Sequence, residues 1–363
     1  MKILWQSIRK ALATDLSALE HLRPIRSAFV ILAALTFTHD KHDTRALLPL
    51  GLGLLFAAIA DRGVSLRRRL TSMAGAAMGI TFAAALGSAV SNDQLLHVAI
   101  GGVVGLVCGL VGIASIPAMT AGVLTLVIFT IFSGSPIDLL EWRTNALLML
   151  LGAGIMIGTV IVEFGIRTLI KRVPDSSIEL YGESFWERSR VHLHWTDPFI
   201  LHALRLAAVI TIATTLEELL TFPHSYWIPM TVAWIAKPDR DGTVEKVTSR
   251  VIGTLFGVAI AGALIATTPD SSVFSLIMVG IASYFVLAFL TPNYTITTTG
   301  ITVFVFFLFR IVGFPMDGSI AARVVSTLIA AALVLIAIRI GQHPRKFDEE
   351  PNETAAQSGD RLS

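Results

Sequence analysis

Charged residues are scarce in this sequence. Asp, Glu, Lys and Arg make up 15% of its 363 residues, whereas soluble domains carry about 25%. Residues 94–137 and 271–309 contain none of the four. Each of these runs is long enough for two bilayer crossings of about 20 residues. The composition therefore excludes an ordinary water-soluble protein and predicts a polytopic helical membrane protein.

Cysteine is nearly absent as well. The single Cys108 excludes a disulfide within one chain, and its apolar neighbours are typical of a small buried side chain. The sequence lacks a Walker phosphate-binding loop, so ATP hydrolysis by this chain is not expected to drive it. His192 and His194 have no further Cys or His ligands nearby. We therefore expect no catalytic residue, no metal, no cofactor, no enzymatic activity and no nucleic-acid partner.

Apolar segments fall into two groups of six. In the first half, 24–170, the expected membrane segments are 24–40, 46–60, 70–91, 95–115, 117–133 and 143–168. In the second half, 199–341, they are 199–218, 225–237, 247–267, 272–290, 295–312 and 319–341. The first two segments of each half are shorter or more polar than the others. We expect these four to be tilted, broken or shielded by their neighbours.

Polar segments flank the two halves. Residues 1–23 repeat Leu and Ile at three- and four-residue steps, which predicts an amphipathic helix on the inner membrane face. Residues 171–198 are expected to form a cytoplasmic linker, and 342–363 a disordered cytoplasmic tail. The pair Asp197-Pro198 is typical of an N-cap followed by the first residue of a helix.

The two halves repeat a pattern at a spacing of about 180 residues. Pro49, Asp61, Gly75 and Gly79 return as Pro229, Asp239, Gly253 and Gly257. Three further residues recur in the same way: Arg26 as Arg205, Asp138 as Asp317, and Arg143 as Arg323. Six crossings per half is an even number, so both halves begin on the same side. The sequence predicts an all-α membrane protein of about twelve transmembrane segments in two parallel pseudo-repeats, related by an axis along the membrane normal.

Basic residues set the expected orientation. Of 28 Lys and Arg residues, only Lys41, Arg45, Arg143, Arg310 and Arg323 lie away from the loops that would share one side with the termini. Cytoplasmic loops of membrane proteins are enriched in Lys and Arg. Both termini are therefore expected in the cytoplasm.

Intramembrane charges suggest a route for anions. An arginine near a membrane segment commonly holds an anion or pairs with a carboxylate, although it can also extend to the lipid headgroups. The arginines concerned are Arg26, Arg205, Arg143 and Arg323, for which Asp138 and Asp317 are alternative partners. Glu217, Glu218 and Glu163 could carry protons if they are partly buried. Asp61 and Asp239 are expected to brace inner loops by pairing with Arg67–Arg69 or Arg250.

The strongest local motif begins the second half. Ser225-Tyr226-Trp227-Ile228-Pro229-Met230-Thr231 is followed by Lys237-Pro238-Asp239, then Arg250, Gly253 and Gly257. Pro229 could end or kink a helix, Tyr226 and Trp227 could anchor at the membrane interface, and the glycines allow close helix packing. Lys237-Pro238-Asp239 is expected to turn the chain at the inner surface.

This motif resembles the fusaric-acid-resistance-like membrane family, which includes aromatic acid exporters and is similar to the aluminium-activated malate transporters of plants. The resemblance is clearest over 225–260 and continues through Asn293-Tyr294 and Arg323. The first half keeps Pro49, Asp61, Gly75 and Gly79 but lacks the aromatic pair and the Lys-Pro-Asp triplet. Long family members carry a large cytoplasmic domain after each membrane half, whereas this chain has only the linker and the tail.

The resemblance implies an exporter of small aromatic or amphipathic organic acids in a bacterial inner membrane, coupled to inward proton flow. Its expected partners are the lipid bilayer, an organic anion and protons, with envelope efflux proteins as possible associates. The expected substrate-binding residues are Arg26, Arg205, Arg143, Arg323, Tyr226, Trp227 and Thr231. Three alternatives remain open: a passive anion channel, a major-facilitator transporter suggested by Asp61-Arg62-Gly63 and Arg67-Arg68-Arg69, and a membrane organiser that transports nothing.

Overall fold

The computed structural model describes residues 13–41, 44–63, 65–134, 141–170, 197–316 and 318–340. The first half forms α2 (Leu22–Asp40), α3 (Leu47–Ile59), α4 (Leu66–Val90), α5 (Gln94–Val111), α6 (Ile116–Gly134) and α7 (Trp142–Leu169). The second forms α9 (Pro198–Leu219), α10 (Trp227–Ile235), α11 (Arg240–Thr267), α12 (Ser272–Ala288), α13 (Tyr294–Val312) and α14 (Ser319–Ile340). Two short 3-10 helices, η1 (Leu16–Ala18) and η2 (Thr44–Ala46), precede α2 and α3. We call the end of the bundle where α7 stops and α9 starts the linker end, and the opposite one the far end.

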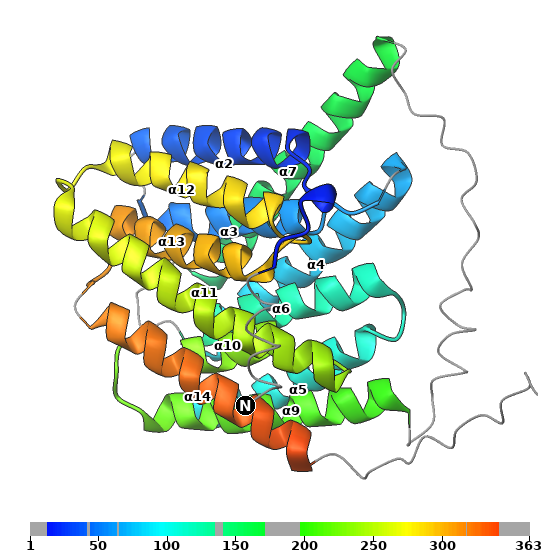
Figure 1. Cartoon of the computed structure of the whole chain (residues 1–363), viewed down its shortest axis with the longest axis vertical. Helices are drawn as coiled ribbons and strands as arrows, with labels where there is room; N and C mark the ends of the chain where they lie inside the picture. Colours follow the sequence, from blue (N-terminus) through cyan, green and yellow to red (C-terminus); the bar gives the residue numbers. More distant parts are fainter. Residues whose placement is uncertain are drawn as a thin grey trace, which may run out of the picture.

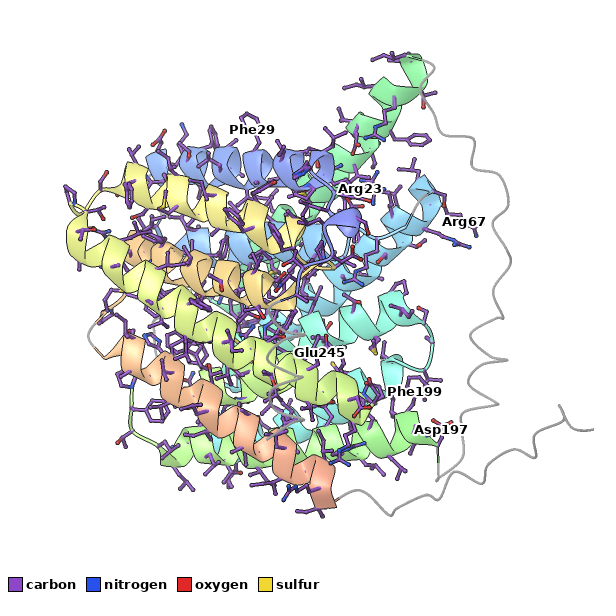
Figure 2. All side chains as sticks on the ribbon, viewed as in Figure 1. Arg23, Phe29, Arg67, Asp197, Phe199 and Glu245 are labelled. Carbon is purple, nitrogen blue, oxygen red and sulfur yellow. The ribbon has the colours of Figure 1, made fainter. Side chains whose placement is uncertain are left out.

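Within the described residues, eight helices are long and apolar enough to cross a membrane: α4, α5, α6, α7, α9, α11, α13 and α14. Large apolar side chains such as Phe29, Phe82 and Leu147 are exposed on the outside of the bundle, and Figure 2 shows Phe29 pointing away from it. Such an exterior suits lipid rather than water. The protein is therefore a multi-pass, all-helical membrane protein, as the sequence predicts.

The second helix of each half is short and fully enclosed. Every residue of α3 and of α10 is buried. At about 1.5 Å per residue, the nine residues of α10 span only about half of a bilayer core. The expectation of shielded segments is confirmed here. Protein on all sides satisfies the backbone that a short helix leaves exposed.

Two predictions about this region were wrong. Pro49 and Pro229 are each the third residue of their helix, so they begin α3 and α10 rather than ending or kinking them. Proline is tolerated in a first turn, where its missing N–H would have no helical partner. Tyr226 and Trp227 are almost completely buried and are therefore not interface anchors.

The packing of one half is repeated in the other. In the first half α4 packs against α6 and α7, and α3 against α7; in the second, α11 packs against α13 and α14, and α10 against α14. The first helix of each half also packs against the other half: α2 packs on α12, and α9 packs on α5. Figure 1 shows these two pairs on opposite sides of the molecule, with α2 and α9 starting at the same end. The halves are therefore parallel pseudo-repeats.

Burial fixes the register between the halves more sharply than the motifs do. In α7 and α14, residues 178 positions apart are buried together: Met149 with Thr327, Met156 with Val334, and Val160 with Ile338. In this register Arg323 corresponds to Asn145. The predicted equivalence of Arg143 and Arg323 was wrong, because a shift of two residues turns a side chain by about 200° around a helix.

The motif glycines differ in what they contact. A Cβ on Gly253 would overlap the carbonyl oxygen of Thr295, and one on Gly257 would lie 2.6 Å from the Cβ of Thr302. Gly79 lies against Thr125, but Gly75 has nothing within 4 Å of its Cβ position. The close-packing role is therefore confirmed for Gly79, Gly253 and Gly257 and was wrong for Gly75.

Several helix ends differ from the expected ones. α4 and α11 begin at 66 and 240 rather than at 70 and 247, because Ser65 and Asp239 cap them with their side-chain oxygens. Asp197 caps α9 and Pro198 follows it, as predicted.

The predicted amphipathic helix over 1–23 is not present in its described part. Residues 13–21 hold only the turn η1, where Asp15 accepts from the Ser17 N–H, and the Asn293 side chain donates to the carbonyl of Ala13 at 3.0 Å. Residues 1–12, 171–196 and 341–363, and with them most of the predicted linker and tail, lie outside the described residues, as do Asp138 and Asp317.

Candidate functional site

A cavity of about 380 Å³ opens at the linker end, where the two halves meet. Its walls come from α5 and α6 of the first half and from α9, α10 and α11 of the second. Arg62, Lys237 and Lys246 bring positive charge to it, against the single carboxylate of Glu245. The volume lies within the range of small-molecule sites. Figure 2 labels Glu245 on α11, where its side chain is exposed.

Aromatic side chains stand beside the cations of this cavity. The Lys246 ammonium lies 4.8 Å from the ring centroid of Tyr294 and donates to the carbonyl of Trp234 at 3.3 Å. Both aromatic residues line the cavity. A wall that joins ammonium groups to aromatic rings suits a solute with an anionic group and an apolar body.

Beyond this cavity, one face of α10 presents aromatic and hydroxyl groups. Trp227, Thr231 and Trp234 are spaced four and three residues apart, so they lie on the same side of the helix. The Arg250 guanidinium lies 5.9 Å from the Trp234 ring, and that of Arg323 lies 4.9 Å from the Trp227 ring. We call Arg250, Arg323, Trp227, Thr231 and Trp234 the arginine-pair site.

The two arginines of this site are buried without counter-ions among the described residues. Both residues are 0% exposed, and none of their side-chain nitrogens has a hydrogen-bond partner in the described part of the chain. The two groups are also close enough to repel each other. A buried, unpaired charge costs several kcal/mol. No described residue offsets that cost with negative charge.

Unpaired hydroxyls surround the arginines. Thr254 lies one turn after Arg250, and Ser326 lies three residues after Arg323, so each shares a helix face with its arginine. Thr298 packs against Gly253 on the neighbouring turn. The side-chain oxygens of these three residues, and those of Thr231 and Tyr294, are buried without partners in the described part of the chain. Buried polar atoms are normally paired with protein, water or ligand.

The arginine-pair site occurs in one half only. In the burial register, Ser72 and Asn145 stand where Arg250 and Arg323 are in the second half. Ser72 donates to the carbonyl of Ala60 at 2.8 Å, and Asn145 donates to Ser88 at 3.2 Å. The corresponding helix α3 has no tryptophan. Among the described residues, the duplicated fold thus carries the arginine pair in its second half only.

A second polar group lies at the far end. His97, which is 0% exposed, has its Nδ1 2.6 Å from a carboxylate oxygen of Glu218 and its Nε2 3.9 Å from one of Glu217. Glu217 is buried, and neither of its oxygens has a hydrogen-bond partner among the described residues. Gly134 of α6 lies against both the Glu217 carboxylate and the Cβ of Tyr226. The predicted proton carriers Glu217 and Glu218 are thus brought together by a histidine.

The predicted site residues Arg26 and Glu163 belong elsewhere. Arg26 pairs with Glu163 and, at 2.8 Å, with Asp61. Arg69 pairs with Asp61 at 2.6 Å and with Glu163 at 3.4 Å, and Arg167 also pairs with Glu163. This cluster ties α2, α4 and α7 together at the linker end of the first half. Arg26 thus already pairs with two carboxylates, Asp61 and Glu163, and lies outside the arginine-pair site.

Arg143 and Arg205 also lie outside the arginine-pair site. Arg143 is exposed and stacks on Trp142, with its Cζ 5.1 Å from the ring centroid. Arg205 is half-buried beside a small void of about 20 Å³, which it shares with His202 and Lys237. The structure therefore brings together Arg323, Trp227 and Thr231, with Tyr226 adjacent, and leaves out the other three predicted arginines.

Asp61 and Asp239 have different roles despite their equivalent positions. Burial tends to raise the pKa of Asp61, but hydrogen bonds from Arg69 and Arg26 hold it below its ordinary value. Asp239 instead caps α11, accepting from the Gly242 N–H at 2.6 Å. The predicted pairing of Asp61 with the 67–69 arginines is confirmed for Arg69, and that of Asp239 with Arg250 was wrong.

Replacing Asp61 by Asn should destabilise the protein by about 3 kcal/mol at neutral pH, because it leaves the buried Arg69 and the half-buried Arg26 short of a counter-ion. Since the folded-state pKa is lowered, the carboxylate stabilises the fold above its ordinary pKa near 4 and loses this effect as the pH falls through the folded value. Thermal unfolding in detergent measures the change. Asp239→Asn is the matched control and should be neutral, because Asn caps helices as well as Asp does. Equal losses in both variants would contradict the assignment.

Sequence reasoning missed four residues of these sites. Arg250 was assigned only to loop bracing, and Trp234, Lys246 and His97 were not singled out. Arg250 had a usable signal, because it is the last charged residue before a run without charges that continues to the end of α11 at Thr267. His97 had none, since its partners are more than a hundred residues away in the chain.

Comparisons with known proteins agree with this architecture. The family profile described as "Fusaric acid resistance protein-like" matches residues 211–337, which contain the arginine-pair site. The Escherichia coli "Inner membrane protein YccS" is 28% identical over 155 residues, covering 42% of this chain and 21% of that protein. An uncharacterized Haemophilus influenzae protein is 29% identical over 147 residues, covering 40% of this chain and 20% of that protein. The matched part thus spans about a fifth of these relatives.

No solved structure matches this chain. The profile match falls on the half in which the motif from Ser225 to Gly257 lies, and it includes Asn293-Tyr294 and Arg323. The resemblance predicted from these residues is therefore confirmed. Through its second half, the chain is similar to the fusaric acid resistance protein-like membrane proteins.

Proposed function

We propose that this protein exports small organic anions across a bacterial inner membrane. The observation that carries the proposal is the arginine-pair site: two fully buried guanidinium groups with no counter-ion among the described residues. A membrane protein retains such charges where they have a function, because each is costly. A transported anion would supply the missing negative charge.

The surroundings favour an aromatic or otherwise amphipathic carboxylate. Trp227 and Trp234 each face one arginine of the pair, and Trp234 also lines the cavity at the linker end. Seven residues of helix separate the two tryptophans, a distance of about 10 Å. A solute entering the cavity would meet Lys246 first, then Arg250, and then Arg323. The family description, which refers to fusaric acid resistance, supports the same substrate class.

The orientation follows from the basic loops. Of the described residues, most Lys and Arg lie at the linker end, among them Arg67 and Lys237, so we assign this end to the cytoplasm. The cavity then faces the cytoplasm, as an exporter requires. Glu217 and Glu218 lie at the opposite end, where they would exchange protons with the exterior. The relative named as an inner membrane protein supports this location. We propose a transport cycle coupled to protons, in the lipid bilayer and without a nucleic-acid partner.

Flux measurements in proteoliposomes test the function. Vesicles that contain the purified full-length protein should release preloaded benzoate faster than empty vesicles, and an imposed pH gradient should change the rate. A passive anion channel would conduct benzoate without responding to the pH gradient once the membrane potential is clamped. An organiser protein would give the flux of empty vesicles, and this result would overturn the proposal.

A further inference from the structure

The far end of the bundle holds two buried ionisable groups, an acid and a base, that are not paired with each other. Glu217 has no hydrogen-bond partner for either carboxyl oxygen, and Arg323 has none for its guanidinium nitrogens, among the described residues. Tyr226 is a neighbour of both: its Cβ and the Glu217 carboxyl group both lie against Gly134, and its ring lies 6.0 Å from that of Trp227. Arg323 in turn lies 4.9 Å from the Trp227 ring. Both charges act on the Tyr226 hydroxyl.

Given the proposed function on which this inference rests, we propose that ionised Glu217 competes with the transported anion for Arg323. His97 and Glu218 supply the proton that neutralises Glu217 and so removes this competition. Among the described residues, Glu217 is a buried carboxyl group that shares Tyr226 as a neighbour with Arg323. A protonated Glu217 is neutral, so it leaves the guanidinium free for the substrate.

The geometry of His97 suits the delivery of a proton. Its two ring nitrogens lie towards different carboxylates, Nδ1 towards Glu218 and Nε2 towards Glu217. The Glu218 side chain is 25% exposed, whereas that of Glu217 is 4% exposed. A histidine can accept a proton at one nitrogen and release one from the other. The proton would therefore pass from the surface to Glu218, then to His97, and finally to Glu217.

The elements around Glu217 bring few other charges to it. α9, which carries Glu217, packs against α5, α10 and α14. These contribute His97 from α5 and Arg323 from α14, while Tyr226 and His224 lie just before α10. Burial lowers the pKa of His224 to about 4, so this ring is neutral at physiological pH. Among the described residues, the ionisable groups that these elements place around Glu217 are thus Arg323, His97, His224 and the adjacent Glu218.

The proposal fixes the direction in which protonation of Glu217 changes the affinity for the anion. Because anion binding is favoured when Glu217 is neutral, the anion and the proton stabilise the same loaded state. Protonation at the far end would therefore favour anion binding at Arg323.

Equilibrium binding of radiolabelled benzoate to the full-length protein in lipid nanodiscs tests the proposal. Benzoate stays ionised between about pH 5.5 and 8.5, since its carboxyl pKa is near 4. The wild type should bind it about tenfold or more tightly at the acidic end, in the range of ordinary couplings between sites. Glu217→Gln should bind tightly throughout, with no dependence on pH. A variant that keeps the wild-type pH dependence would overturn the proposal.

Kinetics test the delivery step separately. After a rapid drop in pH, tryptophan fluorescence should report the change at Trp227. His97→Gln should reach the same final binding about tenfold more slowly, because the relay between the carboxylates is broken. An unchanged rate would remove His97 from the proposal. Thermal unfolding confirms that each variant is folded.

Arg323→Gln distinguishes this inference from the proposed function. It should weaken benzoate binding at every pH. If it does not, the arginine-pair site is not the anion site, and the proposed function fails. If it does, but Glu217→Gln behaves like the wild type, only the competition by Glu217 is excluded.

Discussion

Replacing Arg323 by Met should reduce anion flux by about a hundredfold or more while making the protein more stable. Both effects follow from one observation, the burial of this guanidinium without a counter-ion among the described residues. Losing one partner of a buried charge pair costs about 2–5 kcal/mol of binding energy, and this corresponds to the expected loss of transport.

The stability gain has a separate cause. Replacing a buried charged group by an apolar one of similar volume often stabilises a protein by about 1–4 kcal/mol, because the desolvation penalty disappears. The contact with Trp227 offsets only part of that penalty, at about 2 kcal/mol for a desolvated cation over an aromatic ring. Arg250→Met should behave in the same way. Such a combination of lost function and gained stability is typical of a site maintained for its activity.

Arg143→Met provides the matched control. This arginine lies on α7, the counterpart of α14, but it is exposed and stacks on Trp142. Its replacement should change neither flux nor thermal unfolding temperature by more than the error of measurement. Flux in proteoliposomes and unfolding in detergent are the two readouts. An Arg323→Met protein that unfolds more readily than the wild type would show that the guanidinium holds the fold together, contrary to our interpretation.

Gly253→Ala should prevent stable folding, whereas Gly75→Ala should have no effect. The two glycines occupy equivalent positions in the repeat. An alanine methyl at 253 would overlap the backbone oxygen of Thr295 and lie 2.8 Å from the Cβ of Thr298, so α11 and α13 would have to separate. Overpacking of this kind typically costs about 1–3 kcal/mol, and more where the backbone itself must move.

The control at Gly75 differs only in its surroundings. No atom lies within 4 Å of the position where its Cβ would be, and alanine has a better helix propensity than glycine by about 1 kcal/mol. The yield of monodisperse protein in detergent and the unfolding temperature of each variant measure the difference. Similar yields for the two variants would contradict the close approach of α11 to α13.

The fold was largely predictable because it depends on patterns that lie within single helices. Charge-free runs of fixed length indicate membrane segments, and the recurrence of Pro49 and Asp61 as Pro229 and Asp239 indicates two copies. The candidate site was less predictable because it depends on partners. Arg26 and Arg323 both lie near the start of a membrane helix. Only the structure shows that Glu163, 137 residues away, neutralises Arg26.

Sequence repetition was itself misleading at two points. It matched Arg143 with Arg323, although burial matches Arg323 with Asn145. It also gave Gly75 the same packing role as Gly253. Divergence after duplication kept the spacing of the motifs but changed which of them contact a neighbouring helix. A repeated motif indicates that the two halves share an origin, whereas burial shows which residues contact a neighbouring helix in the structure.

The exchange of first helices between the halves bears on the origin of the chain. Each half relies on the other for the surface that covers its own first helix, as α2 rests on α12 and α9 rests on α5. A half-length ancestor of this fold would thus have been an obligate homodimer with swapped helices. Gene fusion then freed the two copies to differ. The second half could then acquire buried cations, while the first half, fused to it in one chain, needed only to keep its structural role.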